Sequence, residues 1–266
     1  MLKVAGKTHP GRRPGENEDA IGWDNERKLW FVADGMGGHV SGQTASKVVK
    51  DCLLASDGRV AMADRLVQAH GAILEAAVAD ERLSGMGATA VVAGIVNRSL
   101  EVTWVGDSRA YLWRRDKLTQ LSRDHSYVEM LREQNLLSEE QIRGHPHANL
   151  VTQTLGHGDP QPSQVKSRLR SGDWILLCSD GLNDELEDEE MADILRTSAD
   201  VQEAVERLVA AALDRGGRDN TSAVLVEYES TRFGTAIQAL INAPWLPIAV
   251  GACLAVLVAA ILWGQR

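Results

Sequence analysis

Four segments far apart in this chain each deliver an aspartate where an apolar run meets a turn, and this pattern constrains the fold most. The four aspartates, in residues 29–35, 103–108, 175–181 and 217–220, are Asp34, Asp107, Asp180 and Asp219, and the acidic pair Glu18 and Asp19 lies upstream of them. A charge at the end of a buried strand is costly unless it is neutralised or bound. Several carboxylates that converge on one place suit a hard divalent cation, which takes oxygen ligands from carboxylates and backbone carbonyls. We therefore expect these segments to meet at a metal site.

Asp-Gly is also an ordinary turn dipeptide, so each segment taken alone could be no more than a turn. Asp57-Gly58 is an internal comparison, because it follows a predicted helix, has no apolar strand before it and is interpreted as a plain turn. Asp34-Gly35 and Asp180-Gly181 differ, since each ends an apolar run. The coincidence of five acidic sites favours the metal-site interpretation.

The order of apolar runs and helical patterns predicts an α+β fold. Strands are expected at 20–24, 28–33, 87–96, 100–106, 109–114, 163–169, 173–179 and 221–229, and helices at 42–55, 59–79, 187–196 and 201–215. Consecutive strands favour antiparallel pairing, and paired helices favour packing as outer layers. We expect two antiparallel sheets packed as a β-sandwich and flanked by helix pairs, a four-layer α/β/β/α arrangement. The runs at 101–106 and 109–114 flank a tight Asp-Ser turn and are expected to form a hairpin.

The segment from about 122 to 158 breaks this rhythm. Short amphipathic helices are expected at 126–134 and 138–143, followed by His145-Pro-His147. We interpret the segment as a flap over the main domain, a common location for substrate contacts. The two histidines could bind a metal, but the pattern favours a solvated flap.

Composition bounds the class of protein. A hydrophobic content of 44% and a charged content of 24% are typical of a globular chain, and 266 residues suit one large domain, placed at 1–230, with an appendage. The net charge of -9 argues against nucleic-acid binding. Three widely spaced cysteines without a CxxC pair predict no disulfide framework or zinc site and favour a reducing compartment.

The C-terminal tail predicts a membrane anchor. A linker at 231–244 leads to residues 245–263, in which Trp245 and Trp263 bracket 17 residues without a charged side chain. As a helix these residues would span about 26 Å, slightly less than a hydrocarbon core of about 30 Å, with tryptophans at the interfaces. A buried core helix is the alternative, but it usually keeps a polar stripe. Because the N-terminus has no apolar core of signal-peptide length, we expect a single-pass protein of the cytoplasmic membrane with its main domain in the cytosol.

A glycine-rich loop at 35–42 runs into a predicted helix and could hold a phosphate on its backbone amides. It lacks the Gly-Lys-Ser/Thr of a P-loop and is not GxGxxG, so it argues against nucleotide binding. The glycines fit better with the approach of a backbone carbonyl, such as that of Gly35, to a metal.

The chemistry-bearing motifs occur in a fixed order: Asn17-Glu-Asp19, Val32-Ala-Asp-Gly-Met-Gly-Gly-His-Val-Ser-Gly42, Gly87-Ala-Thr89, Val105-Gly-Asp-Ser-Arg109, Asp124-His-Ser126, Cys178-Ser-Asp-Gly181 and Asp219-Asn-Thr221. In this order and spacing, over about residues 7–228, they resemble the motifs of the type 2C (PPM) metal-dependent serine/threonine phosphatases, and Asp-Gly-Met-Gly-Gly-His is similar to the bacterial branch. The resemblance implies a β-sandwich flanked by helices, with Mg²⁺ or Mn²⁺ at the sandwich end.

On this resemblance the chain would hydrolyse phosphoserine and phosphothreonine in proteins, and it would oppose a bacterial Ser/Thr kinase. A water or hydroxide between two Mn²⁺ or Mg²⁺ ions would attack the phosphorus, without a phospho-enzyme. We expect a monomer whose partners are phosphorylated proteins, including the kinase and its substrates.

The expected metal ligands are Glu18, Asp19, Asp34, the carbonyl of Gly35, Asp107, Asp180 and Asp219. Asp34 would bridge the two ions, and Asp180 with Asp219 would complete one of them. Glu18 and Asp19 would act directly or through waters, while Asp107 and Asp180 would hold a weaker third ion.

Two positions depart from the family pattern. The phosphate-binding arginine of the family stands three residues before the Asn of Asn-Glu-Asp, where this chain has Pro14, and we expect Arg13 to orient the phosphoryl group, with Arg12 as the alternative. The eukaryotic branch has a histidine just after Asp-Gly, where this chain has Met36, so a metal-bound water or another group would protonate the leaving oxygen.

The displaced arginine motivates one rival hypothesis, a catalytically weak phosphopeptide- or metal-binding module. A two-metal hydrolase of another substrate is the second rival.

Overall fold

The computed structural model describes residues 2–38, 40–96, 99–136, 141, 145–147 and 149–229. Residues Leu2–Tyr228 form one compact unit. The predicted linker and membrane helix at 231–263, and all but one residue of the flap helix predicted at 138–143, lie outside the described residues. Within the described ranges, no helix is long and apolar enough to cross a membrane.

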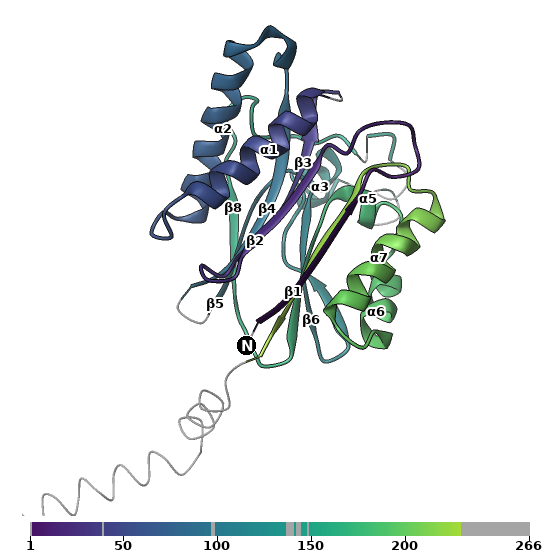
Figure 1. The fold of residues 1–266 in the computed structure, drawn as a ribbon. Coiled ribbons are helices and arrows are strands. Elements are labelled where there is room, and N and C mark those ends of the chain that lie inside the picture. Colours follow the sequence, from purple (N-terminus) through teal and green to yellow (C-terminus); the bar gives the residue numbers. More distant parts are fainter. Residues whose placement is uncertain are drawn as a thin grey trace, which may run out of the picture. The chain divides into compact units, whose positions relative to one another are not determined.

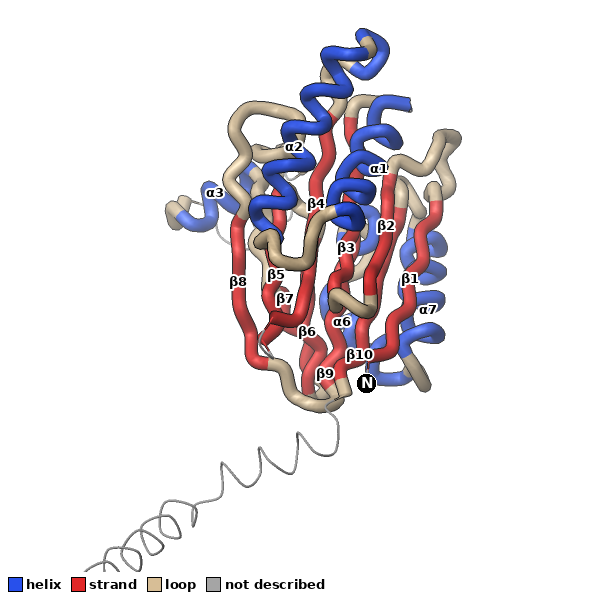
Figure 2. The backbone as a smooth tube through the Cα atoms, turned by 60° about the vertical axis from the view of Figure 1, so that its left-hand side comes forward, coloured by secondary structure: helices blue, strands red, loops and turns tan. Residues whose placement is uncertain are grey.

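Two five-stranded antiparallel sheets make up the centre of this unit (Figures 1 and 2). The first sheet has the order β1 (Leu2–His9), β10 (Thr221–Tyr228), β9 (Asp173–Cys178), β6 (Arg109–Arg114), β7 (Lys117–Gln120). The second has the order β2 (Asp19–Asp24), β3 (Leu29–Met36), β4 (Gly87–Val96), β5 (Ser99–Val105), β8 (Ser163–Arg168). The first and last of these strands along the chain, β1 and β10, are therefore neighbours.

Helices cover the outer face of each sheet. The helices α1 (Val40–Ala55) and α2 (Met62–Ala79) pack on the second sheet, and α6 (Asp188–Thr197) and α7 (Val201–Arg215) pack on the first (Figure 1). Short helices, η1 (Glu81–Leu83), α3 (Tyr127–Glu133) and α5 (Asp180–Asn183), lie in the connections. The predicted α+β class, with two antiparallel sheets and flanking helices, is confirmed.

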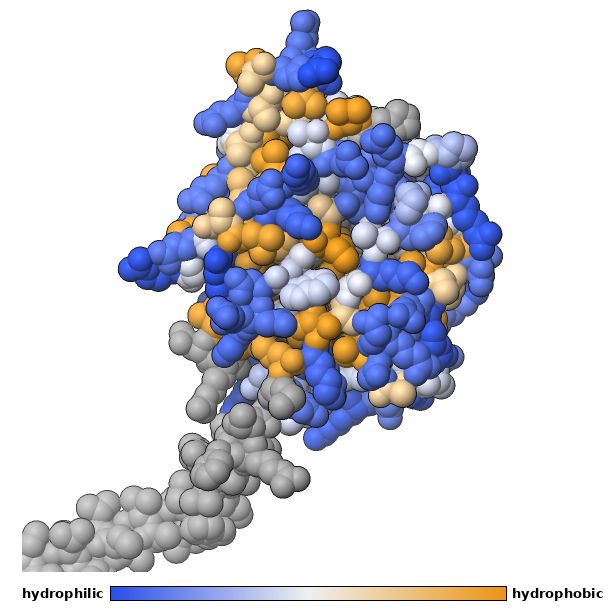
Figure 3. Space-filling model, viewed as in Figure 1, coloured by the Kyte–Doolittle hydropathy of each residue, from blue (hydrophilic) through white to orange (hydrophobic). Residues whose placement is uncertain are grey.

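Strand β3 shows why the central strands read as continuous apolar runs. Phe31 and Ala33 face the α1–α2 layer, whereas Trp30 and Val32 face the other sheet. Because side chains alternate between two buried faces, no polar face interrupts the sequence. Apolar side chains are not confined to the interior, because Val67, Leu74 and Val78 on the outer side of α2 are exposed. Figure 3 shows apolar residues along this helix.

The predicted hairpin of 101–106 with 109–114 is wrong. Strand β5 pairs with β4 and β8 in the second sheet, whereas β6 pairs with β7 and β9 in the first. The chain crosses from one sheet to the other at residues 106–108, where Gly106 has a φ of 103°. This conformation is easily adopted only by glycine, and a Cβ here would collide with the side chain of Thr89. The crossing carries Asp107 to the end of the sandwich.

Candidate active site

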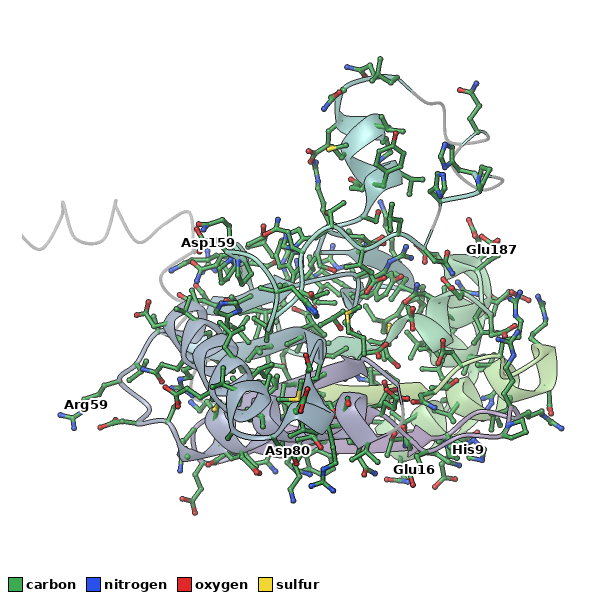
Figure 4. The ribbon with its side chains drawn as sticks, turned by 90° about the horizontal axis from the view of Figure 1, so that it is seen from above. His9, Glu16, Arg59, Asp80, Asp159 and Glu187 are labelled. Carbon is green, nitrogen blue, oxygen red and sulfur yellow. The ribbon has the colours of Figure 1, made fainter. Side chains whose placement is uncertain are left out.

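Carboxylates from both sheets gather at one end of the sandwich. Figure 4 looks onto this end, with His9 labelled at the end of β1 and Glu16 on the segment that leads to β2. Asp34 lies near the end of β3 and pairs in register with Asp19, the first residue of β2. Asp180 begins α5 directly after β9, and Asp219 precedes β10. The charges of Asp19, Asp180 and Asp107 all act on Asp34, so four of the predicted ligands lie in one electrostatic cluster.

A pocket of about 400 Å³ opens over this cluster. Six of the seven predicted metal ligands line it, and the lining includes Glu18, Asp34, Gly35, Asp107, Asp180 and Asp219. Asp19 lies beneath them, with only 8% of its surface exposed. The structure thus brings together residues that are separated by up to 201 positions in the sequence.

Desolvation dominates the electrostatics of the cluster. The surrounding protein raises the pKa of Asp34 and of Asp180 well above the ordinary value, and repulsion from neighbouring aspartates adds to this effect. Burial also raises the pKa of Asp19 and of Asp107 to about 6. The ionised carboxylates of the cluster are therefore destabilised by burial and by one another, and a bound cation would compensate for both effects.

Two carboxylate oxygens in the cluster are shielded from solvent and accept no hydrogen bond from the protein. Asp19 Oδ1 and Asp180 Oδ1 are buried and have no hydrogen-bond partner. Within the described ranges, no three His, Cys, Asp or Glu side chains are arranged to enclose an ion by themselves. Mg²⁺ commonly keeps several waters and uses only one or two carboxylates. The pocket, with its carboxylates and the Gly35 backbone, therefore fits hydrated hard cations and not a closed all-protein cage.

Hydrogen bonds hold Asp19 between the two sheets. Ser179 Oγ donates to Asp19 Oδ2 at 2.7 Å, and the backbone N–H of Ser222 donates to Ser179 Oγ at 3.0 Å. Asp19 belongs to the second sheet, whereas Ser179 follows β9 and Ser222 lies in β10 of the first. The link fixes one oxygen of Asp19, and the other has no hydrogen-bond partner.

The glycine-rich loop makes room for Glu18. The backbone N–H of Gly35 donates to the Glu18 carbonyl at 3.2 Å. A Cβ at Gly42 would collide with the carboxylate of Glu18, and a Cβ at Gly35 would collide with the Gly42 backbone. Gly42 lies in the first turn of α1, where the helix dipole favours a carboxylate. The need for space around Glu18 therefore explains Gly35 and Gly42. From the sequence, these glycines had been interpreted as allowing a backbone carbonyl to approach a metal.

Asn220 joins the loop after β1 to the start of β10. Its Oδ1 accepts from the Glu18 N–H at 2.7 Å, and its Nδ2 donates to the carbonyls of Pro10 and Glu16 at 3.1 and 3.3 Å. The motif Asp219-Asn-Thr221 thus supplies one pocket carboxylate and one side chain that holds another in place. No role for Asn220 was predicted from the sequence.

The three arginines near the pocket have different surroundings. Arg12 donates to the Leu213 carbonyl and pairs with Asp214, both at the end of α7, so it is turned away from the pocket. Arg13 lines the pocket, beside Pro14. Arg218 lines it too and is paired with Glu185. Arg218 was missed in the sequence analysis, although it stands next to Asp219 in the sequence.

A buried ion pair supports the crossing that carries Asp107. Arg109 donates from Nε and Nη2 to both oxygens of Asp124, at 3.0 and 2.6 Å, and from Nη1 to the Tyr111 hydroxyl at 3.2 Å. Thr89 and Ser108 share a hydrogen bond of 2.7 Å on the other side of the crossing. The motifs around residues 89, 107 and 124 therefore work as one scaffold for Asp107.

The described part of the flap reaches the site at Val151, which lines the pocket, and at Asn149. Asn149 Nδ2 donates to Asp184 Oδ2 at 2.9 Å, and Asp184 follows α5. The rings of His145 and His147 lie 5.7 Å apart, and both pack near Tyr127. These two histidines are not among the residues that line the pocket.

Residues 6–216 match the sequence profile of the family described as Protein phosphatase 2C. The chain belongs to the protein phosphatase 2C family. The resemblance inferred from the ordered motifs is confirmed. The carboxylates at the end of the sandwich are residues of those motifs.

Named relatives support the same assignment. The serine/threonine phosphatase stp of Listeria innocua is 32% identical over 236 residues, which cover 83% of this chain and 94% of the relative. PstP of Mycobacterium tuberculosis is 32% identical over 241 residues, but the match covers only 46% of that protein, so this phosphatase 2C chain spans about half the length of that relative. A crystal structure of the PstP catalytic domain in complex with two manganese ions aligns with a TM-score of 0.74 at 30% identity, covering 86% of this chain and 99% of that one.

Proposed function

We propose that this protein phosphatase 2C is a metal-dependent protein serine/threonine phosphatase. The observation that carries the proposal is the set of desolvated carboxylates, two of them with an unpartnered buried oxygen, beneath a pocket that also carries arginines. Hydrolysis of a phosphoric monoester needs both features, because the transferred group is an anion and the attacking water must be activated. The names of the relatives and the manganese in the PstP structure agree with this chemistry.

The pocket carboxylates would hold two Mn²⁺ or Mg²⁺ ions. Asp34 would bridge them beside the Gly35 carbonyl, Asp180 and Asp219 would complete one of them, and Asp107 with Asp180 would hold a weaker third ion. Glu18 and Asp19 would act directly or through waters. Two such ions, when bound, lower the pKa of a bridging water and neutralise charge on the phosphoryl oxygens.

The remaining steps fall to other side chains and solvent. Arg13 would orient the phosphoryl group from the pocket wall. Met36, which also lines the pocket, has no proton to give, so the proton for the leaving serine or threonine oxygen would come from water in the pocket. The substrates would be phosphorylated proteins, including those modified by an opposing kinase.

We further propose that residues 245–263 anchor the enzyme to the cytoplasmic membrane, with the domain at 1–230 on the cytosolic side. The support is the sequence alone, namely the charge-free run between Trp245 and Trp263.

The test is release of phosphate from a phosphothreonine peptide with and without Mn²⁺. We expect Mn²⁺-dependent turnover that Asp34→Asn or Asp180→Asn abolishes, while circular dichroism shows an intact fold. Binding of the peptide without any release of phosphate would favour the binding-module rival. Turnover of another phosphate ester but of no phosphopeptide would favour the rival hydrolase. Normal activity of Asp34→Asn at saturating Mn²⁺ would overturn the two-metal assignment.

A further inference from the structure

Arg218 occupies a position from which a guanidinium can reach the pocket. It lines the pocket together with Arg13, and 61% of its side chain is exposed. The residue in the position of the family's phosphate-binding arginine is Pro14, which cannot donate a hydrogen bond. The pocket therefore has two candidate arginines, and neither stands at the sequence position of the family's phosphate-binding arginine.

Glu185 fixes the guanidinium of Arg218. Arg218 Nε donates to Glu185 Oε1 at 2.9 Å, and Nη2 donates to Oε2 at 3.3 Å. The backbone N–H of Arg218 also donates to Oε1, at 3.1 Å, and Nη2 reaches the Asp184 carbonyl at 3.3 Å. The side chain of Glu185 is only 4% exposed, so this anchor is a buried carboxylate. The hydrogen bond from Arg218 lowers the pKa of Glu185, which keeps the pair ionised.

The pairing leaves Nη1 of the guanidinium unused. No described residue accepts a hydrogen bond from Arg218 Nη1, and the Arg13 side chain has no hydrogen-bond partner among the described residues. A planar guanidinium whose Nε and Nη2 are held in this way can present the two N–H bonds of Nη1 to the oxygens of a phosphate group. Because its orientation is already fixed, Arg218 loses less conformational entropy on binding than a mobile side chain does.

The loops that carry Arg13 and Arg218 are joined to each other. The Arg12 N–H donates to the Gly217 carbonyl at 2.7 Å, and Asn220 binds the carbonyls of Pro10 and Glu16. The positive charge of Arg13 also acts on Glu185. Both cations therefore belong to the same wall of the pocket.

We propose that Arg218 binds the phosphoryl group of the substrate and that Glu185 is its positioning residue. This inference rests on the proposed phosphatase function. Arg218, together with Arg13, takes over the contact that the family makes from the position of Pro14. The ligand class is a phosphate monoester dianion, or inorganic phosphate as the product.

Two measurements test the proposal on the full chain with Mn²⁺. Steady-state kinetics on a phosphothreonine peptide give KM and kcat, and calorimetric titration with inorganic phosphate gives a Kd that does not depend on turnover. For Arg218→Ala we expect KM and the phosphate Kd to rise about tenfold or more, the loss typical of a charged hydrogen bond, with a smaller change in kcat. Arg218→Lys should recover part of the affinity, because it keeps the charge but loses the fork.

The matched control is Arg215→Ala, which removes the same charge from the last turn of α7, where Arg215 pairs with Glu190. It should leave KM and the phosphate Kd unchanged. Glu185→Gln should raise KM in the wild-type background. It should have no further effect in the Arg218→Ala background, because Glu185 acts on the phosphate only through Arg218. A structural role of Glu185 alone would weaken both backgrounds equally.

The outcomes separate the two proposals. An active wild type in which Arg218→Ala leaves both KM and the phosphate Kd unchanged would overturn the role of Arg218 and leave the phosphatase function standing, with Arg13→Ala expected to carry the whole effect. An inactive wild type whose phosphate binding is weakened by Arg218→Ala would overturn the phosphatase function and still support the phosphate contact.

Discussion

Asp19 and Asp34 face each other as a registered pair across the β2–β3 ladder. Like charges placed directly opposite each other on an antiparallel pair are destabilising. Ser179 donates to one oxygen of Asp19, and the other oxygen is buried without a partner. The folded state therefore holds this pair at a cost, which a bound cation would offset.

Replacement of Asp34 by Asn should make the metal-free protein more stable, because it removes a desolvated charge from the cluster. It should also remove the stabilisation by Mn²⁺, which is about 2.7 kcal/mol when a single site is exposed to an ion at 100 times its Kd. Calorimetric unfolding in EDTA and in Mn²⁺ measures both effects. Asp57→Asn, at the plain Asp-Gly turn, is the control and should keep the full response to Mn²⁺. An equal response in Asp34→Asn would show that the ion binds elsewhere.

Replacement of Asp124 by Asn should lower the free energy of unfolding by about 2–3 kcal/mol, since it leaves a mostly buried Arg109 without its counter-charge. The matched control is Asp193→Asn, which breaks the exposed pair with Arg196 on α6 and should cost less than about 0.5 kcal/mol. Urea unfolding of both variants gives the comparison. Equal losses would mean that the pair with Arg109 is not a supporting contact of the crossing.

Stability should fall as the pH drops below about 6.5, in part because of His125. The backbone N–H of Gly106 donates to its Nδ1 at 3.2 Å, so the neutral ring carries its proton on Nε2, which reaches Ser163 Oγ at 2.9 Å. Burial lowers the pKa of His125 below its usual 6.5 in the folded state. The unfolded state then binds the proton first, so this contribution is present above pH 6.5 and is lost as the pH falls toward the folded-state pKa.

The variant His125→Asn keeps an acceptor for Gly106 but does not titrate. Its free energy of unfolding, measured from pH 8 to pH 5, should decline less steeply than that of the wild type. The difference between the two curves isolates His125 from the carboxylates of the pocket. Parallel curves would contradict the assigned tautomer and its effect.

A chain that ends at Ser230 should fold and should keep full activity, because every proposed ligand precedes that residue and β10 ends at Tyr228. The complete chain should be recovered with membranes and require detergent, if residues 245–263 are an anchor. Cell fractionation, with phosphatase assays on both forms, is the measurement. Recovery of the complete chain in the soluble fraction, or misfolding of the shorter one, would point to a core helix instead.

The sequence predicted the central strands well because both of their faces are buried, which leaves unbroken apolar runs such as that of β4. It failed at the edge strands β1 and β7, since Leu2–His9 and Lys117–Gln120 alternate with charged residues and read as loops. The turn at 106–108 looked like a hairpin because local spacing does not tell whether the next strand joins the same sheet. The pairing of β5 with β8 and of β6 with β9, which are distant in the sequence, distinguishes these cases.

The site was predictable wherever a carboxylate ended an apolar run, as at Asp34 and Asp180. The residues that support these carboxylates were not, because their roles depend on pairs distant in sequence. Glu185 stands in an acidic stretch that reads as a solvated surface, yet it is buried against Arg218. Arg13 was preferred to Arg12 only because it stands nearer to the position of Pro14, whereas in the structure Arg13 lines the pocket and Arg12 is held at the end of α7.

The pairing of β1 with β10 has a consequence for biosynthesis. In its sheet, β1 has a single neighbour, and that neighbour is the last strand of the domain to be made. The nascent chain therefore carries its first strand unpaired until Tyr228 has been synthesised. Asp219 and Asn220 belong to the same late segment, so the pocket is complete only after this segment has been made. A chain that stops before this segment lacks one proposed metal ligand and the side chain that holds Glu18 in place.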